Sequence, residues 1–343
     1  MLMTSHLTDE AYQSYILQGV SRTFALTIPQ LPPDLSQVVG NGYLLCRIAD
    51  TIEDEPQLTP TQKRFFSQQF TQVVAGELSA EAFSQALFPR LSEHTLIAEK
   101  DLISNMPRVI RLTHRFNASQ RAALYRCVRI MAKGMADFQQ NNTLAGLKDL
   151  SEMNRYCYYV AGVVGEMLTD LFCYYSPYIA QNQVTLQALA VSFGQALQMT
   201  NILKDIWEDR QRGACWLPQE IFTQVGFDLQ NLSPNYYDPA FGEGLAKLIG
   251  ITYTHLHNAL CYILLIPPHE SGIRRFCLWA LGMAILTLRR INQRRDFCQG
   301  QQVKISRRSV KATILVSNWF TCSDISLRAL FYLLTRALPR ETR

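Results

Sequence analysis

The chain has 343 residues, 48% of them hydrophobic and 18% charged, and a mean hydropathy of −0.03, which is typical of a soluble globular protein. Its nine cysteines are odd in number and contain no C-x-x-C pair, which argues against a disulfide framework and a zinc site and favours a reducing, cytoplasmic compartment. Residues 1–269 carry 19 basic and 24 acidic side chains, whereas residues 270–343 carry 14 basic and 4 acidic. This basic C-terminal part could bind anionic lipid or a diphosphate, or it could be a solvated surface without a partner. Nothing in it resembles a nucleic-acid-binding motif.

Helical periodicity dominates the sequence, and we find neither a run of alternating strands nor an internal repeat. The main helix breaks are expected where prolines cluster, at 29–33, 56–60, 234–239 and 267–268. The stretches between Pro107 and Pro177 and between Pro268 and Pro339 have no internal proline and predict long helices with short connections. Residues 230–244 are expected to form the longest loop. The sequence therefore predicts a single all-α domain over residues 1–343.

No signal peptide or membrane span is predicted. The N-terminal sequence MLMTSHLTDEAYQ has no basic region followed by an apolar stretch. The longest apolar runs, at 278–288 and 327–334, are too short to cross a bilayer. The segment LRALFYLLTRALPR, at 327–340, instead predicts an amphipathic helix that rests on a membrane surface. We therefore expect a cytoplasmic protein in peripheral contact with the membrane.

Two short acidic clusters stand out, DTIED at 50–54 and DIWED at 205–209. Each places carboxylates at i, i+3 and i+4, so that the side chains leave a helix from one face. Because about two acidic i,i+4 pairs are expected by chance, either cluster alone is compatible with an exposed acidic face that makes i,i+4 pairs with Lys204 or Arg210. Both clusters, however, follow largely apolar sequence, YLLCRIA and FGQALQMTNILK, which is not typical of a solvated helix face. Taken together, the two clusters favour a binding site.

The second cluster extends into a stripe of oxygen-bearing side chains. At 100° per residue this stripe is about 80° wide and comprises Gln198, Asn201, Asp205 and Asp209. The neighbouring side chains that lie off the stripe are Met199, Leu203, Ile206 and Trp207. Oxygen ligands without a paired cysteine or histidine suit Mg²⁺ better than zinc, and protein-bound Mg²⁺ is typically shared with substrate phosphates. Two such helix faces opposite one another would hold magnesium between them.

The order of four motifs resembles that of the squalene and phytoene synthases, the head-to-head prenyltransferases. These motifs are SRTF at 21–24, RIADTIEDEP at 47–56, YCYYVAGVVGEM at 156–167 and QMTNILKDIWEDRQRGACWLPQE at 198–220. The similarity runs from roughly residue 12 to roughly residue 310 and is closest to the squalene synthases. It implies an isoprenoid-synthase helical bundle around a central apolar cavity, with both acidic motifs at its mouth. The implied reaction joins two farnesyl diphosphates into presqualene diphosphate, which NADPH then reduces to squalene, a precursor of sterols or hopanoids.

The resemblance also assigns roles to individual residues. It implies that Mg²⁺ is bound by Asp50, Glu53, Asp54, Asn201, Asp205 and Asp209, of which the four aspartates also serve catalysis. Tyr156 matches a tyrosine that lies near the departing diphosphate and the carbocation, where a phenol can donate a hydrogen bond, present its ring face or remove a proton. Gly162 and Gly165, in the same helix, imply close helix contact or room for substrate.

Substrate contacts are implied for Ser21, Arg22, Arg47, Gln198, Arg212, Phe276 and Lys304. Two of these have a plainer interpretation: Ser21 suits a cap on the following helix, and Arg47 suits an ion pair with a carboxylate of the first cluster.

The resemblance also implies that NADPH contacts Lys304, and Arg307 could take the place of a neighbouring basic residue of the family. No G-x-G-x-x-G follows a strand, so a Rossmann site for NADPH is not predicted. The chain departs from the family pattern in this region. It has Ala280 and Leu281 where Pro-Gln is usual, and Ser306 where a basic side chain is frequent.

Two alternatives remain open from sequence. A dehydrosqualene or phytoene synthase would share the first half of the reaction and stop without NADPH. A protein of a different class, a non-catalytic helical protein, would bind membranes through the basic C-terminal part. Prenyl chain length and oligomeric state are not predicted.

Overall fold

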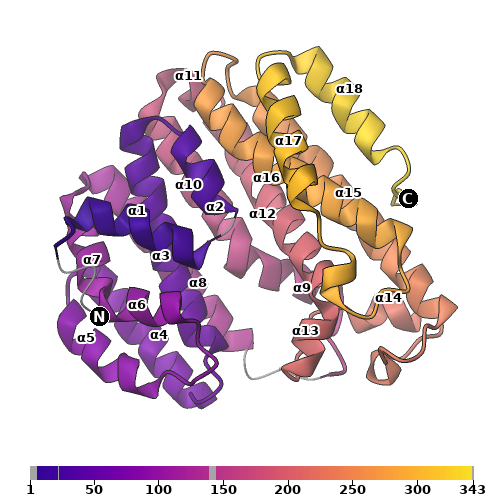
Figure 1. The fold of residues 1–343 in the computed structure, drawn as a ribbon, viewed down its shortest axis with the longest axis horizontal. Coiled ribbons are helices and arrows are strands. Elements are labelled where there is room, and N and C mark those ends of the chain that lie inside the picture. Colours follow the sequence, from indigo (N-terminus) through magenta and orange to yellow (C-terminus); the bar gives the residue numbers. More distant parts are fainter. Residues whose placement is uncertain (1–5, 22, 139–143, 342–343) are drawn as a thin grey trace. The chain divides into compact units, whose positions relative to one another are not determined.

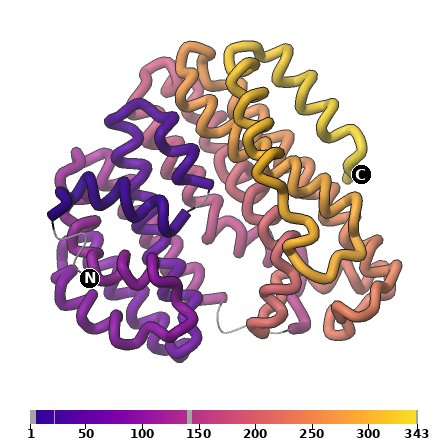
Figure 2. Tube along the Cα trace, viewed as in Figure 1, coloured from indigo at the N-terminus to yellow at the C-terminus, as the bar shows by residue number. Residues whose placement is uncertain are grey.

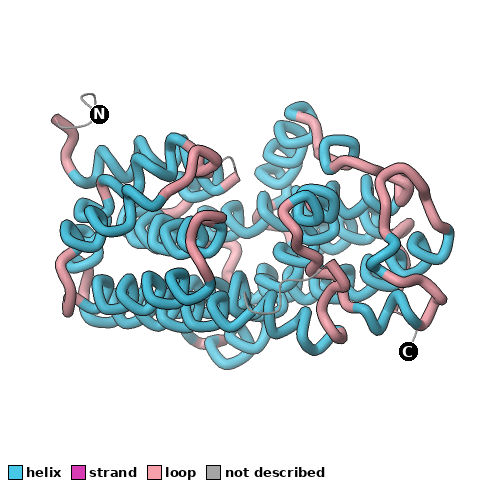
Figure 3. Tube along the Cα trace, turned by 90° about the horizontal axis from the view of Figure 1, so that it is seen from below, coloured by secondary structure: helices cyan, strands magenta, loops and turns pink. Residues whose placement is uncertain are grey.

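The computed structural model describes residues 6–21, 23–138 and 144–341, and there the chain consists of helices joined by loops (Figure 3). Within these ranges the β-type pairings are two isolated bridges, Leu147 with Pro218 and Ser233 with Tyr236. The predicted all-α fold is confirmed. The chain divides into two compact units, residues 1–140 with 166–181 and residues 141–165 with 182–343 (Figure 1).

The first unit is organised around α3 (Pro33–Asp54), whose apolar side chains are buried along most of its length. Helices α1, α4, α6, α7 and α8 all contact it. The helices of this unit are α1 (Asp9–Val20), α2 (Phe24–Thr27), η1 (Ile28–Gln30), α3, α4 (Pro60–Ala75), α5 (Ala80–Leu87), η2 (Phe88–Arg90), α6 (Ile97–Ser104), α7 (Met106–Arg115), α8 (Ala118–Phe138), most of α10 (Val163–Tyr175) and α11 (Pro177–Ala180). The first acidic cluster therefore closes the central helix of this unit.

The sequence explains why α3 ends directly after this cluster. Pro56 disfavours helical geometry at Glu55, which has φ −67° and ψ 113°. The next helix then starts on a capping box, in which Thr59 Oγ1 accepts from the Gln62 backbone N–H and the Gln62 side chain accepts from the Thr59 backbone N–H. The acidic side chains are thus fixed within the last two turns of a well-packed helix.

The second unit is organised around α12 (Gln183–Lys204), which contacts α9, η4, α15 and α16. The elements of this unit are α9 (Leu150–Cys157), the π-helical turn η4 (Tyr158–Gly162), α12, α13 (Ile206–Gln211), α14 (Gln219–Thr223), η5 (Leu229–Asn231), α15 (Pro239–Leu265), α16 (Ser271–Gln293), η6 (Gly300–Gln302), α17 (Arg307–Phe320) and α18 (Asp324–Thr335). The second acidic cluster lies at the end of this unit's central helix, as the first cluster does in its own unit.

Glycines bring the two motif-bearing segments of this unit together. A Cβ added to Gly165 would lie 2.3 Å from the carbonyl oxygen of Ala190, and one added to Gly194 would lie 2.2 Å from that of Ala161. Such distances are sterically impossible, so only glycine permits α12 to approach the start of α10 at Gly165 and η4 at Ala161. The predicted close helix contact at Gly165 is confirmed. The π-helical turn itself was not predicted.

Two boundaries differ from the predictions. The helix does not run unbroken through the second cluster, because α12 ends at Lys204 and Asp205, with φ −100° and ψ 16°, separates it from α13. Hydrogen bonds from Asp205 N to Asn201 O and from Asp209 N to Asp205 O, both 2.9 Å, nevertheless keep the i→i−4 pattern. The expected loop at 230–244 is also shorter, because Pro239 occupies the first turn of α15 and Asp238 caps it.

Helices α15 and α16 are long and apolar enough to span a membrane by length and composition. The sequence prediction considered uninterrupted apolar runs, of which that at 278–288 lies within α16. In the most apolar 18-residue stretch of each helix, 50% of α15 and 67% of α16 is buried inside the protein. Core helices of globular proteins meet the same criterion, so this property does not establish a membrane span.

Candidate functional site

The first acidic cluster contains an arginine held by two carboxylates. Arg47 Nη1 lies 3.7 Å from Asp50 Oδ2, and Arg47 Nη2 lies 2.7 Å from Oε1 of Glu99, in the first turn of α6. The alternative prediction of an ion pair between Arg47 and Asp50 is confirmed. Glu99 was not predicted, because nothing in its local sequence distinguishes it from a solvated acidic residue. The Nε of Arg47 is buried and has no hydrogen-bond partner among the described residues.

The other acidic residues of this region divide into two kinds. Asp54 is exposed and Glu53 is partly exposed, so their side chains are accessible to a ligand. Glu55 is 2% exposed, and its carboxylate accepts hydrogen bonds from Gln57 N, Ser92 N and Thr95 Oγ1. Although burial opposes ionisation, these hydrogen bonds hold the pKa of Glu55 below its ordinary value. Glu55 therefore anchors the chain after α3.

Burial raises the pKa of Asp50 to about 7, and the neighbouring carboxylates of Asp54 and Glu99 add to this effect while Arg47 opposes it. The folded protein thus binds a proton at Asp50 more tightly than the unfolded chain does. Stability from this group is present at low pH and is lost as the pH rises toward 7. A bound cation would reverse this penalty by favouring the carboxylate.

We predict that Asp50→Asn stabilises the free protein at pH 8 by about 1–3 kcal/mol and that the gain shrinks as the pH falls toward 4. Asparagine resembles the protonated acid, and Arg47 keeps its pairing with Glu99. Urea unfolding of both proteins across this pH range measures the difference. A gain that is equal at every pH would contradict the raised pKa.

The second acidic cluster already holds a cation. Lys204 Nζ lies 3.0 Å from Asp205 Oδ2 and 3.3 Å from Asn201 Oδ1, so the ammonium group bridges two of the predicted metal ligands. Burial raises the pKa of Asp205, while Lys204 opposes the shift. The predicted stripe agrees with the burial pattern, because the four side chains placed off it are buried: Met199, Leu203, Ile206 and Trp207. Of the stripe, Asn201 is exposed and Gln198, Asp205 and Asp209 are partly exposed.

Three neighbouring side chains hold α13 in place. Trp207 Nε1 donates to Phe297 O over 2.7 Å, and Glu208 Oε1 accepts from Gly300 N over 3.2 Å. Arg210 donates to the carbonyl oxygens of Leu144 and Leu229. The alternative prediction of i,i+4 pairs is not what the structure has, because Lys204 pairs with the adjacent Asp205 and Arg210 donates to backbone carbonyl groups.

Tyr156, at the end of α9, is 6% exposed and stacks on Trp216 with ring centroids 4.0 Å apart and an angle of 5° between the planes. Trp216 follows the second acidic cluster in sequence, and a backbone bridge between Leu147 and Pro218 keeps the two segments together. Gln195, on α12, also donates to Asn154 O. The second unit therefore brings the predicted tyrosine and the second motif into one packed region. Trp216 was not predicted, because its partner is 60 positions away.

The remaining predicted residues differ in their settings. Ser21 Oγ accepts from Phe24 N over 2.9 Å, so the plainer prediction of a cap is confirmed. Arg22 lies outside the described residues. Phe276, on α16, is 4% exposed, whereas Arg212, Lys304 and Arg307 are all exposed.

The oxygen-bearing side chains of each cluster are suitable ligands for Mg²⁺ that also carries a bound anion. Within the described ranges, however, no three histidine, cysteine, aspartate or glutamate side chains come together as a complete metal site. Carboxylates at the C-terminal end of a helix are unfavourable next to its negative dipole end, yet both central helices end this way. A cation relieves that cost, as Lys204 does for Asp205. Oxygen donors suit Mg²⁺, and an incomplete ligand set suits an ion whose coordination a substrate diphosphate completes. That the two clusters face one another remains a prediction.

Comparisons with known proteins agree with these features. The family model for squalene/phytoene synthase matches residues 17–309. A squalene synthase of Eremothecium gossypii is 28% identical over 90% of this chain and 68% of its own length. A squalene synthase of Saccharomyces cerevisiae is 27% identical over 88% of this chain and 66% of its own length, so the chain spans about two thirds of these relatives.

Solved structures show the same fold. That of TcSQS with the ligand BPH1237 has a TM-score of 0.74 at 22% identity and covers 98% of this chain and 94% of that chain. A dehydrosqualene synthase has a TM-score of 0.65 at 21% identity, with coverage of 91% and 96%. With most of its length matched by the family model, this chain belongs to the squalene/phytoene synthase family.

Proposed function

We propose that the protein is a squalene synthase that condenses two farnesyl diphosphates through presqualene diphosphate and reduces the intermediate with NADPH. The observation that carries this proposal is the pair of carboxylate clusters at the ends of the two central helices, together with family membership. The squalene synthases among its relatives support the choice of product.

The residues have defined tasks in this proposal. Asp50, Glu53 and Asp54 of one unit and Asn201, Asp205 and Asp209 of the other would hold Mg²⁺, which when bound stabilises the negative charge of leaving diphosphate. Arg47 has a partly exposed guanidinium group that Glu99 holds in place, and this group would donate hydrogen bonds to a diphosphate oxygen. Tyr156 places a phenol against the rigid face of Trp216, where it can donate a hydrogen bond to the leaving group.

The second half of the reaction needs a dry pocket and a reductant. Phe276 is buried on α16 and would help to exclude water from the carbocation. Lys304 and Arg307 are exposed cations at the start of α17, where a helix N-terminus also favours phosphate, and they would bind the NADPH phosphates. NADPH, if bound there, would supply the hydride for the reduction.

The product assay tests this proposal. Purified protein is incubated with farnesyl diphosphate and Mg²⁺, with and without NADPH, and the extracted lipids are identified by mass spectrometry. We expect squalene only in the tube with NADPH. Dehydrosqualene in both tubes would establish the second candidate, a dehydrosqualene synthase, whose fold the chain also shares. Failure to consume farnesyl diphosphate in either tube would refute the proposed function.

We also propose that the protein acts in the cytoplasm with peripheral membrane contact, because its hydrocarbon product is insoluble in water. Deleting the predicted membrane-binding segment, for example residues 326–343, is not a suitable test of this contact. Leu327, Phe331 and Thr335 of α18 are buried, and their loss would expose the core of the second unit. Substitutions of exposed residues on α17 and α18 are the appropriate test.

A further inference from the structure

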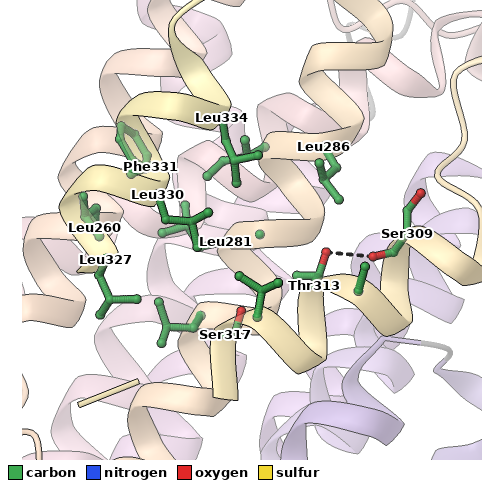
Figure 4. Close-up of a pocket in the computed structure, with 15 residues that line it drawn as sticks. Leu260, Leu281, Leu286, Ser309, Thr313, Ser317, Leu327, Leu330, Phe331 and Leu334 are labelled. Carbon is green, nitrogen blue, oxygen red and sulfur yellow. Dashed lines mark hydrogen bonds between the residues drawn. The ribbon is translucent and has the colours of Figure 1, made fainter. Parts of the chain in front are cut away.

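The second unit contains an apolar cavity of about 290 Å³ between α15, α16, α17 and α18. Figure 4 shows Leu281 and Leu286 of α16 and Leu330 and Leu334 of α18 pointing into the same space. The described residues that line it are all uncharged. An engineered apolar cavity of about 150 Å³ stays dry and binds benzene. The present cavity is therefore large enough for part of a hydrocarbon chain.

This cavity is separate from the pocket expected at Phe276. At 100° per residue, Leu281 lies about 140° and Ile285 about 180° around α16 from Phe276. Leu281 and Ile285 therefore lie on a different face of α16 from Phe276, which does not line the cavity. The hydroxyl group of Thr313 on the cavity wall donates to Ser309 O of its own helix over 2.9 Å (Figure 4), so this group does not require water in the cavity.

The cavity opens beneath an unusually apolar surface. Ala312 lines the cavity and is also exposed, which places it at the opening. Helices α17 and α18 form a hairpin (Figure 2) whose outer faces carry large exposed apolar side chains. Trp319 on α17 is 74% exposed and Ile325 on α18 is 83% exposed. Three more large apolar side chains on this surface are exposed: Leu315, Tyr332 and Leu333.

The charges on the same surface have one sign. The exposed residues of α17 and α18 include four basic side chains, Arg307, Arg308, Lys311 and Arg328, and no acidic one. The one acidic residue in these helices, Asp324, is only partly exposed and pairs with Arg274 over 2.8 Å. A surface that combines exposed tryptophan and aliphatic side chains with unpaired positive charge matches the boundary of an anionic bilayer.

We propose that the α17–α18 hairpin docks on an anionic lipid bilayer and that one lipid acyl chain enters the cavity between α16, α17 and α18. Positive charges attract the headgroups, the exposed apolar side chains enter the interface, and the cavity receives the chain. This inference extends the membrane contact proposed above and does not depend on the reaction.

Binding of a single chain is tested with a fluorescent long-chain fatty acid, cis-parinaric acid, below its micelle concentration. Wild type is expected to bind it saturably, and Ala312→Trp is expected to weaken binding at least 10-fold by filling the opening. Ala329→Trp is the matched control, because Ala329 is exposed on α18 but does not line the cavity. Equal binding by wild type and Ala312→Trp would overturn the assignment, as would displacement by farnesol but not by oleic acid.

Docking is tested by sedimentation with vesicles of phosphatidylcholine, with and without phosphatidylglycerol. We expect binding only to the anionic vesicles, and a loss of at least about 10-fold in the double variant Lys311→Glu, Arg328→Glu, because each basic residue near such a surface contributes about 1 kcal/mol. Equal binding to both vesicle types would refute the proposal. Consumption of farnesyl diphosphate in detergent is measured on the same samples and should not change, so failure to bind lipid and failure of the proposed reaction give different results.

Discussion

Replacing Asp205 with asparagine is expected to lower the turnover of farnesyl diphosphate by about 10²–10³-fold, the cost typical of removing one charge-stabilising group from an active site. The substitution removes the negative charge that a cation needs but keeps the shape of the side chain. Lys204 retains its second partner, Asn201 Oδ1. Because burial raises the pKa of Asp205, the folded protein should not lose stability at neutral pH.

The control is Asp228→Asn, the same change in the same unit at a residue that only caps η5. Steady-state kinetics and the shift in melting temperature on adding Mg²⁺ with pyrophosphate are measured for both variants. Asp228→Asn should retain both properties, and Asp205→Asn should lose both. Full turnover in Asp205→Asn would exclude the second cluster from the reaction.

Replacing Arg274 with methionine is expected to destabilise the second unit by about 2–5 kcal/mol, because two buried carbonyl acceptors lose their donor at a cost of about 1–3 kcal/mol each. Arg274 is completely buried on α16. Its Nε donates to Ile266 O over 2.6 Å, and its Nη1 donates to Thr321 O over 3.0 Å and to Asp324 Oδ1 over 2.8 Å. One guanidinium group therefore ties the ends of α15 and α17 to the start of α18. Methionine leaves these acceptors unpaired.

Asp324→Asn separates the contribution of charge from that of the hydrogen-bond network. Asparagine can still accept from Arg274, and the Asp324 side chain is 45% exposed, so we expect a loss of at most about 1 kcal/mol. Thermal unfolding and hydrogen exchange of α17 and α18 are the measurements. Equal destabilisation by both substitutions would show that the ion pair, and not the capping of backbone carbonyls, holds the hairpin.

Both acidic clusters conflict with local rules of helix stability. They place negative charge at the negative end of a helix dipole, and Asp50 and Asp205 have raised pKa values. The apolar helices that carry them are otherwise well packed. Local conflicts in a consistent fold are characteristic of functional sites. In this interpretation both predictions have one cause, a buried carboxylate at the C-terminal end of a helix. Asp50→Asn gains stability because it removes such a carboxylate, and Asp205→Asn loses activity because the reaction needs one.

Much of the fold and part of the candidate site could be predicted from the sequence. Helical periodicity and proline positions identified an all-α chain, since both act on the local backbone. The apolar positions around the second cluster were assigned correctly, as the burial of Met199 and Leu203 shows, because side-chain direction on a helix follows from spacing alone. The close contact at Gly165 was predicted for a different reason. Glycine inside a helix costs stability, so it usually has a packing role there.

The tertiary structure alone decided which distant groups meet. Glu99 holds Arg47 across 52 positions, Trp216 stacks on Tyr156, and Arg274, one of the basic residues of the C-terminal part, is completely buried. Such contacts depend on which helices pack together, and the same residue types occur more often on solvated surfaces. The sequence by itself therefore determined which side chains share a helix face, whereas packing determined whether a charge is exposed, paired or buried, because that depends on neighbours from other helices.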